Sequence, residues 1–134
     1  MSRESACALA EARKRSRVAR MYLEVAELAA DEEADEARNV AAGNAVLAGI
    51  AASDAICCTR LGRRHRGQDH QGAIALLNRI QPNGATLARA LATVLAIKDP
   101  AHYGHDFVSD TRLKTTLRTA TQLVEAAEST IRPD

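Results

Sequence analysis

The segment 35–61 limits the possible folds most, because small and apolar side chains recur along it at the spacing of one long helix. One side of this helix is a ridge of small residues, which lets a neighbouring helix approach closely. The ridge consists of Ala42, Ala45, Gly49 and Ala52. A second stripe is apolar except for Asp54, a carboxylate on an otherwise hydrophobic line. Gly62 follows directly and is the expected end of the helix.

The segment 4–30 shows the same helical period, with Val18, Tyr22 and Val25 on one stripe. The basic run within 13–20 is expected to form a solvated face of this helix. An acidic run at 31–36 is expected to hold the turn into the second helix, where carboxylates favour the positive helix end.

A third helix is expected to begin at Gln68 or Asp69. Pro82 and Gly84 interrupt it in the sequence QPNG, and a further helical stretch covers about 85–98.

Residues 99–105 are expected to form a loop, and Ser109 has the character of an N-cap for the last helix. That helix has the cleanest apolar stripe of the chain, and no segment has a strand pattern. The sequence therefore predicts an all-α fold: an antiparallel up-and-down four-helix bundle with an interrupted third helix, in a single domain over residues 1–134.

Cys7, Cys57 and Cys58 are odd in number and include no CxxC pair, so neither a disulfide framework nor a zinc knuckle is predicted. This pattern suits a reducing cytoplasm. We expect Cys57 and Cys58 to be inert core thiols. The N-terminus has no signal-peptide pattern, and no run of about twenty apolar residues is expected to span a bilayer. A cytoplasmic protein without a membrane segment is therefore expected.

The most basic stretch of the chain is RRHRGQDH, residues 63–70. The net charge of the chain is only +1, so affinity for nucleic acid has to come from a local patch of this kind. Arginine forks fit phosphate groups, and a histidine with a pKa near neutrality can transfer a proton. Together they are the minimal equipment for cleaving RNA through its own 2′-hydroxyl without a metal. The few aromatic residues argue against RNA binding by base stacking.

A structural interpretation of this loop stays open. In it, Asp54 and Asp69 pair with the loop arginines, and His70 satisfies the start of the third helix. Helical spacing puts His70 on the face of Ile74 and Leu77, so it is expected to point toward the bundle or toward a dimer interface.

The long second helix, the Gly-Arg loop before the third helix and the sequence IKDPAHYG at 97–104 give a pattern that resembles the HEPN superfamily. The resemblance covers about residues 10–130 and implies an HEPN-like bundle. Many HEPN proteins are toxins of toxin–antitoxin systems or antiviral ribonucleases, often dimeric and often encoded beside a nucleotidyltransferase partner.

The catalytic signature of that superfamily is an arginine, four to six further residues and a histidine. Arg64 and His70 match it with five residues between them, and Arg63 and His70 match it with six. The resemblance therefore implies that Arg64 binds the scissile phosphate and that His70 acts as acid or base in a metal-independent endoribonuclease. The other basic side chains would bind substrate phosphates, with two aspartates in support. These residues are Arg60, Arg63, His65, Arg66, Asp54 and Asp69.

The chain departs from the family in two respects. The motif opens the third helix instead of lying near the last one, and Gln71, Gly72 and Ala73 follow the histidine where some members carry a tyrosine that the partner modifies. The alternative function is therefore a non-catalytic HEPN-like module that binds a nucleotide or a nucleotidyltransferase partner through loop 60–70. A purely structural helical dimer is the third interpretation.

Neither function requires a cofactor. A weaker candidate site is HYGHD at 102–106, because His102, His105 and the following aspartate can bind zinc or nickel, whereas Tyr103 fits packing at the end of the bundle. The ridge of small residues predicts a homodimer, formed through that ridge or through the loop-bearing face. In the superfamily two motifs meet across the dimer, so each protomer would supply half of the site.

Overall fold

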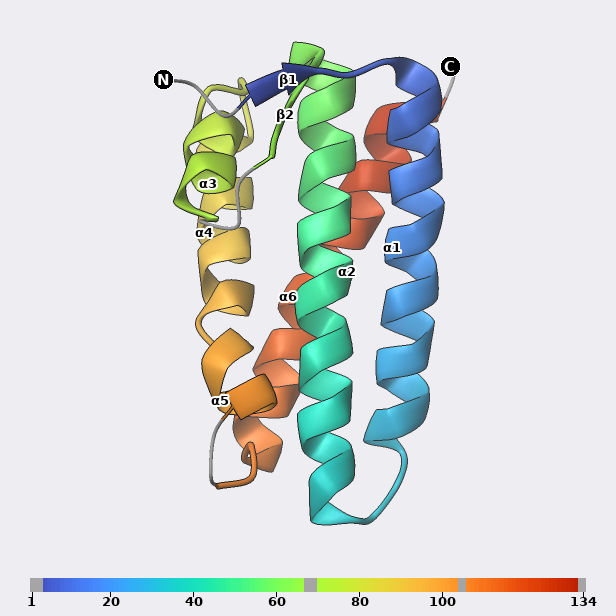
Figure 1. Ribbon diagram of the computed structural model, residues 1–134, viewed down its shortest axis with the longest axis vertical. Coiled ribbons are helices and arrows are strands. Elements are labelled where there is room, and N and C mark those ends of the chain that lie inside the picture. Colours follow the sequence, from blue (N-terminus) through green and yellow to red (C-terminus); the bar gives the residue numbers. More distant parts are fainter. Residues whose placement is uncertain (1–3, 67–69, 104–105, 133–134) are drawn as a thin grey trace.

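The computed structural model describes residues 4–66, 70–103 and 106–132, except for the side chains of Pro100, His102 and Tyr103. Their regular secondary structure is helical apart from one short strand pair. Helices α1 and α2 run side by side in opposite directions, and α6 packs behind them. On the other side of α2, α3 packs against α4, and α4 leads on to α5 (Figure 1). In chain order the elements are β1 (Glu4–Ala6), α1 (Leu9–Ala30), α2 (Asp35–Leu61), β2 (Arg63–His65), α3 (Gln71–Asn78), α4 (Gly84–Leu95), α5 (Lys98–Tyr103) and α6 (Asp110–Ile131).

The central element is α2, which packs against α1, α4, α5 and α6. Its ridge of small residues is buried in the core, as predicted for a surface of close helix approach. A Cβ atom on Gly49 would lie 3.0 Å from the side chain of Val94 and 3.4 Å from that of Leu123. The approaching helices are therefore α4 and α6 of the same chain. The expectation that this ridge forms a dimer face is wrong, because the bundle covers it.

By length and composition α2 is also apolar enough to cross a membrane, which the sequence analysis did not expect of any segment. It is the one helix of this kind among the described residues, and 72% of its most apolar window is buried inside the bundle. Its hydrophobicity is thus used in packing against the neighbouring helices, as in the core helix of a helical bundle.

Local signals predicted the helix ends well. Gly62 ends α2 in the left-handed conformation with φ of 66°, and its N–H donates to the carbonyl of Cys58. The Ser109 hydroxyl accepts a hydrogen bond from the N–H of Arg112 at 3.2 Å and caps α6. The carboxylates Asp35 and Glu36 lie in the first turn of α2.

Three local predictions were wrong. The third helix begins at Gln71, with His70 at its N-cap position, and not at Gln68 or Asp69. The first helix begins at Leu9, because residues 4–6 form β1, which pairs antiparallel with β2 so that Glu4 lies opposite His65 and Ala6 opposite Arg63. Neither strand is long enough to produce a periodic pattern, and each is held by a partner far away in the sequence. The expected loop at 99–105 is helical as far as Tyr103, in α5.

The cysteine prediction was also wrong. Cys7 and Cys58 form a disulfide, with their Cα atoms 5.3 Å apart, which ties the segment after β1 to the last turn of α2. Cys57 alone is a free, buried thiol, and burial raises its pKa to about 12. The three cysteines therefore form one disulfide bridge and leave one inert core thiol.

Candidate functional site

The basic loop does form part of a pocket. The pocket has a volume of about 160 Å³ and lies where β2 and α3 meet α2 and α4. Polar side chains from the predicted site share it with three apolar residues that wall it off from the core. The lining residues are Ile50, Asp54, Arg64, His65, Arg66, His70, Ala73 and Leu91.

Asp54 is the acidic member of this pocket. It follows Ile50 by one turn of α2, and the residue is only 9% exposed. Its carboxylate accepts a hydrogen bond at 3.0 Å from the guanidinium of Arg15 on α1, in a partly buried ion pair. Burial raises the pKa of Asp54, while the positive charges of Arg15, Arg64 and His70 oppose that rise.

Two neighbouring arginines of strand β2 have different surroundings. Arg63 forms an ion pair of 3.5 Å with Glu4 on β1, whereas Arg64 lines the pocket. Of these two arginines, only Arg64 lines the pocket, since Arg63 is turned to Glu4 of the neighbouring strand. Glu4 also pairs with Arg79 at 3.3 Å, so Arg63 belongs to a small ion-pair cluster beside the pocket.

The two histidines are held by the start of α3. His70 is half-buried at the N-cap position, and its carbonyl accepts hydrogen bonds from the N–H groups of Ala73 and Ile74 at 3.1 and 3.2 Å. The ring of His65 lies against Gly72, where a Cβ atom would come within 2.3 Å of it. Glycine at this position therefore gives the imidazole of His65 room to lie against the helix.

The structure brings five predicted site residues together: Asp54, Arg64, His65, Arg66 and His70. The other two described candidates are engaged elsewhere. Arg60 donates to the carbonyl of Gln81 in the turn between α3 and α4, and Arg63 pairs with Glu4. Asp69, the remaining candidate, lies outside the described residues.

Sequence reasoning missed the contributions of Arg15 and Gly72. The arginine was assigned to a solvated face, yet it reaches Asp54 across a separation of 39 residues. No local pattern encodes such a pair. Gly72 carried a usable signal, because an isolated glycine near a helix start indicates a close approach of another group.

His105 and the side chain of His102, the histidines of the alternative metal site, lie outside the described residues. Within the part of the chain that is described, no three His, Cys, Asp or Glu side chains cluster as metal ligands would. The pocket offers guanidinium and imidazole donors around a buried carboxylate that already has a cationic partner. Such an arrangement suits an anion rather than a metal cation.

No family model matches the sequence, and no curated protein matches it significantly. The geometry defines a small helical protein with a basic pocket, and this pocket is its candidate functional site.

Proposed function

We propose that the pocket beside β2 binds a phosphate group of a nucleotide. The observation that carries this proposal is that Arg64, His65 and His70 line the same small pocket, although they come from two different elements. Arg15 already neutralises Asp54, so the positive charge of Arg64 and Arg66 is in excess at this point.

The size of the pocket limits which ligands can enter it. Pockets that enclose whole small molecules usually have volumes of about 300–1,000 Å³. A volume of about 160 Å³ suits the charged end of a ligand, with the remainder outside. A terminal phosphate that projects into the pocket fits this description, and the rest of the nucleotide would lie against the exposed Arg66.

The second candidate function is metal-independent cleavage of RNA. It is favoured by the presence of two histidines in one pocket with Arg64. In this reaction the 2′-hydroxyl attacks the phosphorus and loses its proton to a base, while the bond to the 5′-oxygen breaks and that oxygen receives a proton from an acid. His70 and His65 would be the acid and the base, and Arg64 would stabilise the charge on the phosphate. We place this function second because His70 lies at the N-cap position of α3 and shares its pocket with the buried Asp54 inside one bundle, an arrangement that a structural histidine would also have.

The same proposal includes the resemblance to the HEPN superfamily and the toxin or antiviral role that it implies. It also includes a nucleotidyltransferase partner and a homodimer. A dimer would have to use a face other than the buried ridge of α2, and light scattering at micromolar concentration tests it. The cytoplasmic location expected from the cysteine pattern is not part of this proposal, because the disulfide of Cys7 and Cys58 favours an oxidising compartment.

Arg63 and Arg64 provide a matched test of phosphate binding. We expect Arg64→Gln to weaken the binding of AMP by about tenfold, because one charge-assisted contact is lost. Arg63→Gln removes the same charge one residue away, but from the ion pair with Glu4. Because this exposed pair lies outside the pocket, the affinity for AMP should change by less than about twofold. Equal losses in both variants, measured by calorimetric titration, would show that binding is non-specific attraction to a basic loop.

Cleavage is tested separately with total RNA in the presence of EDTA. If His70 transfers a proton, His70→Ala should lower the rate by about 10²-fold or more. A wild-type protein that binds AMP and cuts no RNA would exclude the ribonuclease and leave the binding module.

A further inference from the structure

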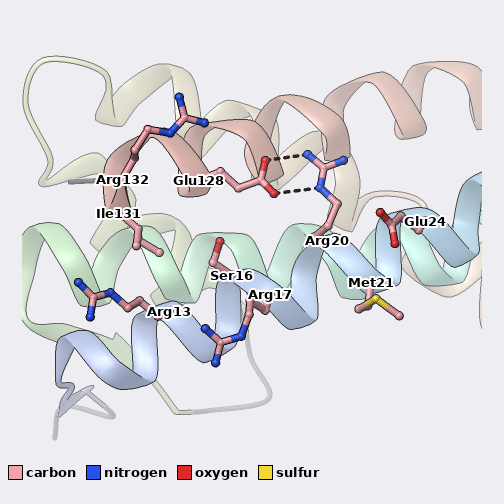
Figure 2. A pocket seen from close by; sticks show the side chains of 9 residues that line it. All are labelled: Arg13, Ser16, Arg17, Arg20, Met21, Glu24, Glu128, Ile131 and Arg132. Carbon is pink, nitrogen blue, oxygen red and sulfur yellow. Dashed lines mark hydrogen bonds and ion pairs between the residues drawn. The ribbon is translucent and has the colours of Figure 1, made fainter. Parts of the chain in front are cut away.

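A second hollow lies between residues 13–24 of α1 and the end of α6, and it shares no lining residue with the Arg64 pocket. Its volume is about 750 Å³, within the usual range of about 300–1,000 Å³ for sites that hold whole small molecules. Four arginines line it, three of them from the basic run that the sequence analysis assigned to a solvated face. We call it the α1–α6 groove (Figure 2).

Helical spacing explains how the arginines gather. Arg13, Arg17 and Arg20 are four and three residues apart, so they lie along one side of α1, and Arg132 comes from the end of α6. Arg20 is committed to the fold: its guanidinium donates two hydrogen bonds, of 2.7 and 2.9 Å, to the carboxylate of Glu128. The hydrogen bond from Arg20 lowers the pKa of Glu128, so this pair stays ionised at neutral pH.

The charge of Arg132 also acts on Glu128 and helps to lower its pKa, which leaves Arg13 and Arg17 as the less engaged arginines of the groove. Among the described residues, no carboxylate forms an ion pair with Arg13, Arg17 or Arg132. The remaining carboxylate of the groove, Glu24, lies beside Met21 at the end opposite Arg13 (Figure 2). The groove is therefore positive at one end and mildly acidic at the other, and an anion is favoured only at the arginine end.

The groove also has apolar surface. Ile131 points from α6 into the space between the helices near Arg13, and Met21 is 60% exposed at the far end (Figure 2). Met21 and Arg17 also border an adjoining hollow of about 430 Å³ that continues along α1 past Val18. None of the residues that line the α1–α6 groove is aromatic, so it offers no platform for stacking a base or another flat ring.

We propose that the α1–α6 groove binds an amphiphilic anion, a molecule with one phosphate or carboxylate head and an aliphatic body. The head contacts Arg13 and Arg17, which lie one turn apart on α1, and the body lies over Ile131 toward Met21. The aliphatic parts of the arginine side chains add apolar contacts to the body of the ligand. This site is independent of the phosphate pocket proposed above.

The test compares four probes below their micellar concentrations by calorimetric titration: dodecyl phosphate, dodecanoate, inorganic phosphate and dodecyl maltoside. We expect at least one of the two charged amphiphiles to bind about tenfold or more tightly than either inorganic phosphate or dodecyl maltoside, because head and body each contribute. The tighter of the two charged probes identifies the head group.

Variants locate the site. Arg13→Gln combined with Arg17→Gln should weaken the better charged amphiphile by about tenfold or more. The control combines Arg89→Gln and Arg118→Gln, which removes the same charge from exposed arginines of α4 and α6 and should leave affinity unchanged. The proposal is overturned if dodecyl maltoside binds as tightly as both charged amphiphiles, if the control loses as much as the double variant, or if the loss occurs only in Arg64→Gln.

Discussion

Arg15 of α1 and Asp54 of α2 are joined by an ion pair of 3.0 Å at the edge of the pocket beside β2. This contact links the first helix to the candidate site, although Arg15 itself does not line the pocket. Without it, the pocket would contain a buried carboxylate that competes for the loop arginines. The pair therefore leaves Arg64 and Arg66 available to an anionic ligand.

The first prediction concerns this pair. Arg15→Gln leaves the Asp54 charge without its main partner, and we expect the free energy of unfolding to fall by about 2 kcal/mol at neutral pH. This loss is smaller than the roughly 3–5 kcal/mol lost when a fully buried ion pair is broken, because the Arg15 side chain is 35% exposed. Arg17→Gln, which removes an exposed charge from the same helix, should cost less than about 0.5 kcal/mol. Urea unfolding of the two variants checks this, and equal effects would contradict it.

The second prediction concerns pH. Burial raises the pKa of Asp54, so the folded state holds the proton more tightly than the unfolded state, whose carboxyl pKa is about 3.9. The contribution of Asp54 to stability is therefore complete below that pH and is lost as pH rises through the folded-state pKa. Relative to Asp54→Asn, the wild type should become less stable over this range. Unfolding of both proteins from pH 3.5 upward measures it, and a difference that grows in the opposite direction would show a lowered pKa.

The third prediction concerns Gly72 and His65. In an ordinary helix, Gly→Ala is stabilising by up to about 1 kcal/mol. Here the new methyl group would meet the His65 ring at 2.3 Å, and we expect Gly72→Ala to cost about 1–3 kcal/mol instead. In a His65→Ala background the clash is gone, so the same change should be neutral or stabilising. A double-mutant cycle by denaturant unfolding measures the difference, and additive effects would mean that the ring does not lie against Gly72.

The fourth prediction concerns the disulfide. The Cys7–Cys58 bridge closes a loop with a sequence separation of 51 residues, so Cys7→Ser should cost about 2–4 kcal/mol in oxidised protein. Under dithiothreitol the two proteins should have nearly equal stability. Peptide mapping without reduction should find Cys7 linked to Cys58 and Cys57 as a free thiol. A link to Cys57 would contradict this arrangement.

Much of the helical framework was predictable from local signals. Gly62 and Ser109 lie at helix ends because backbone conformation and capping depend on neighbours within about four residues. The bounds of α2 and the break at Pro82 follow from the same kind of information. The strands were missed because three-residue elements carry no period, and their stability comes from pairing with each other.

The sequence by itself therefore determined where the long helices lie, where most of them end and which loop is basic. Only the tertiary structure decided that Arg64 and His70 share a pocket while Arg63 does not, that Arg15 reaches Asp54, and that Cys7 bridges to Cys58. The reason is physical: periodicity and capping are interactions along one helix, whereas these contacts depend on which faces come together when the whole bundle packs.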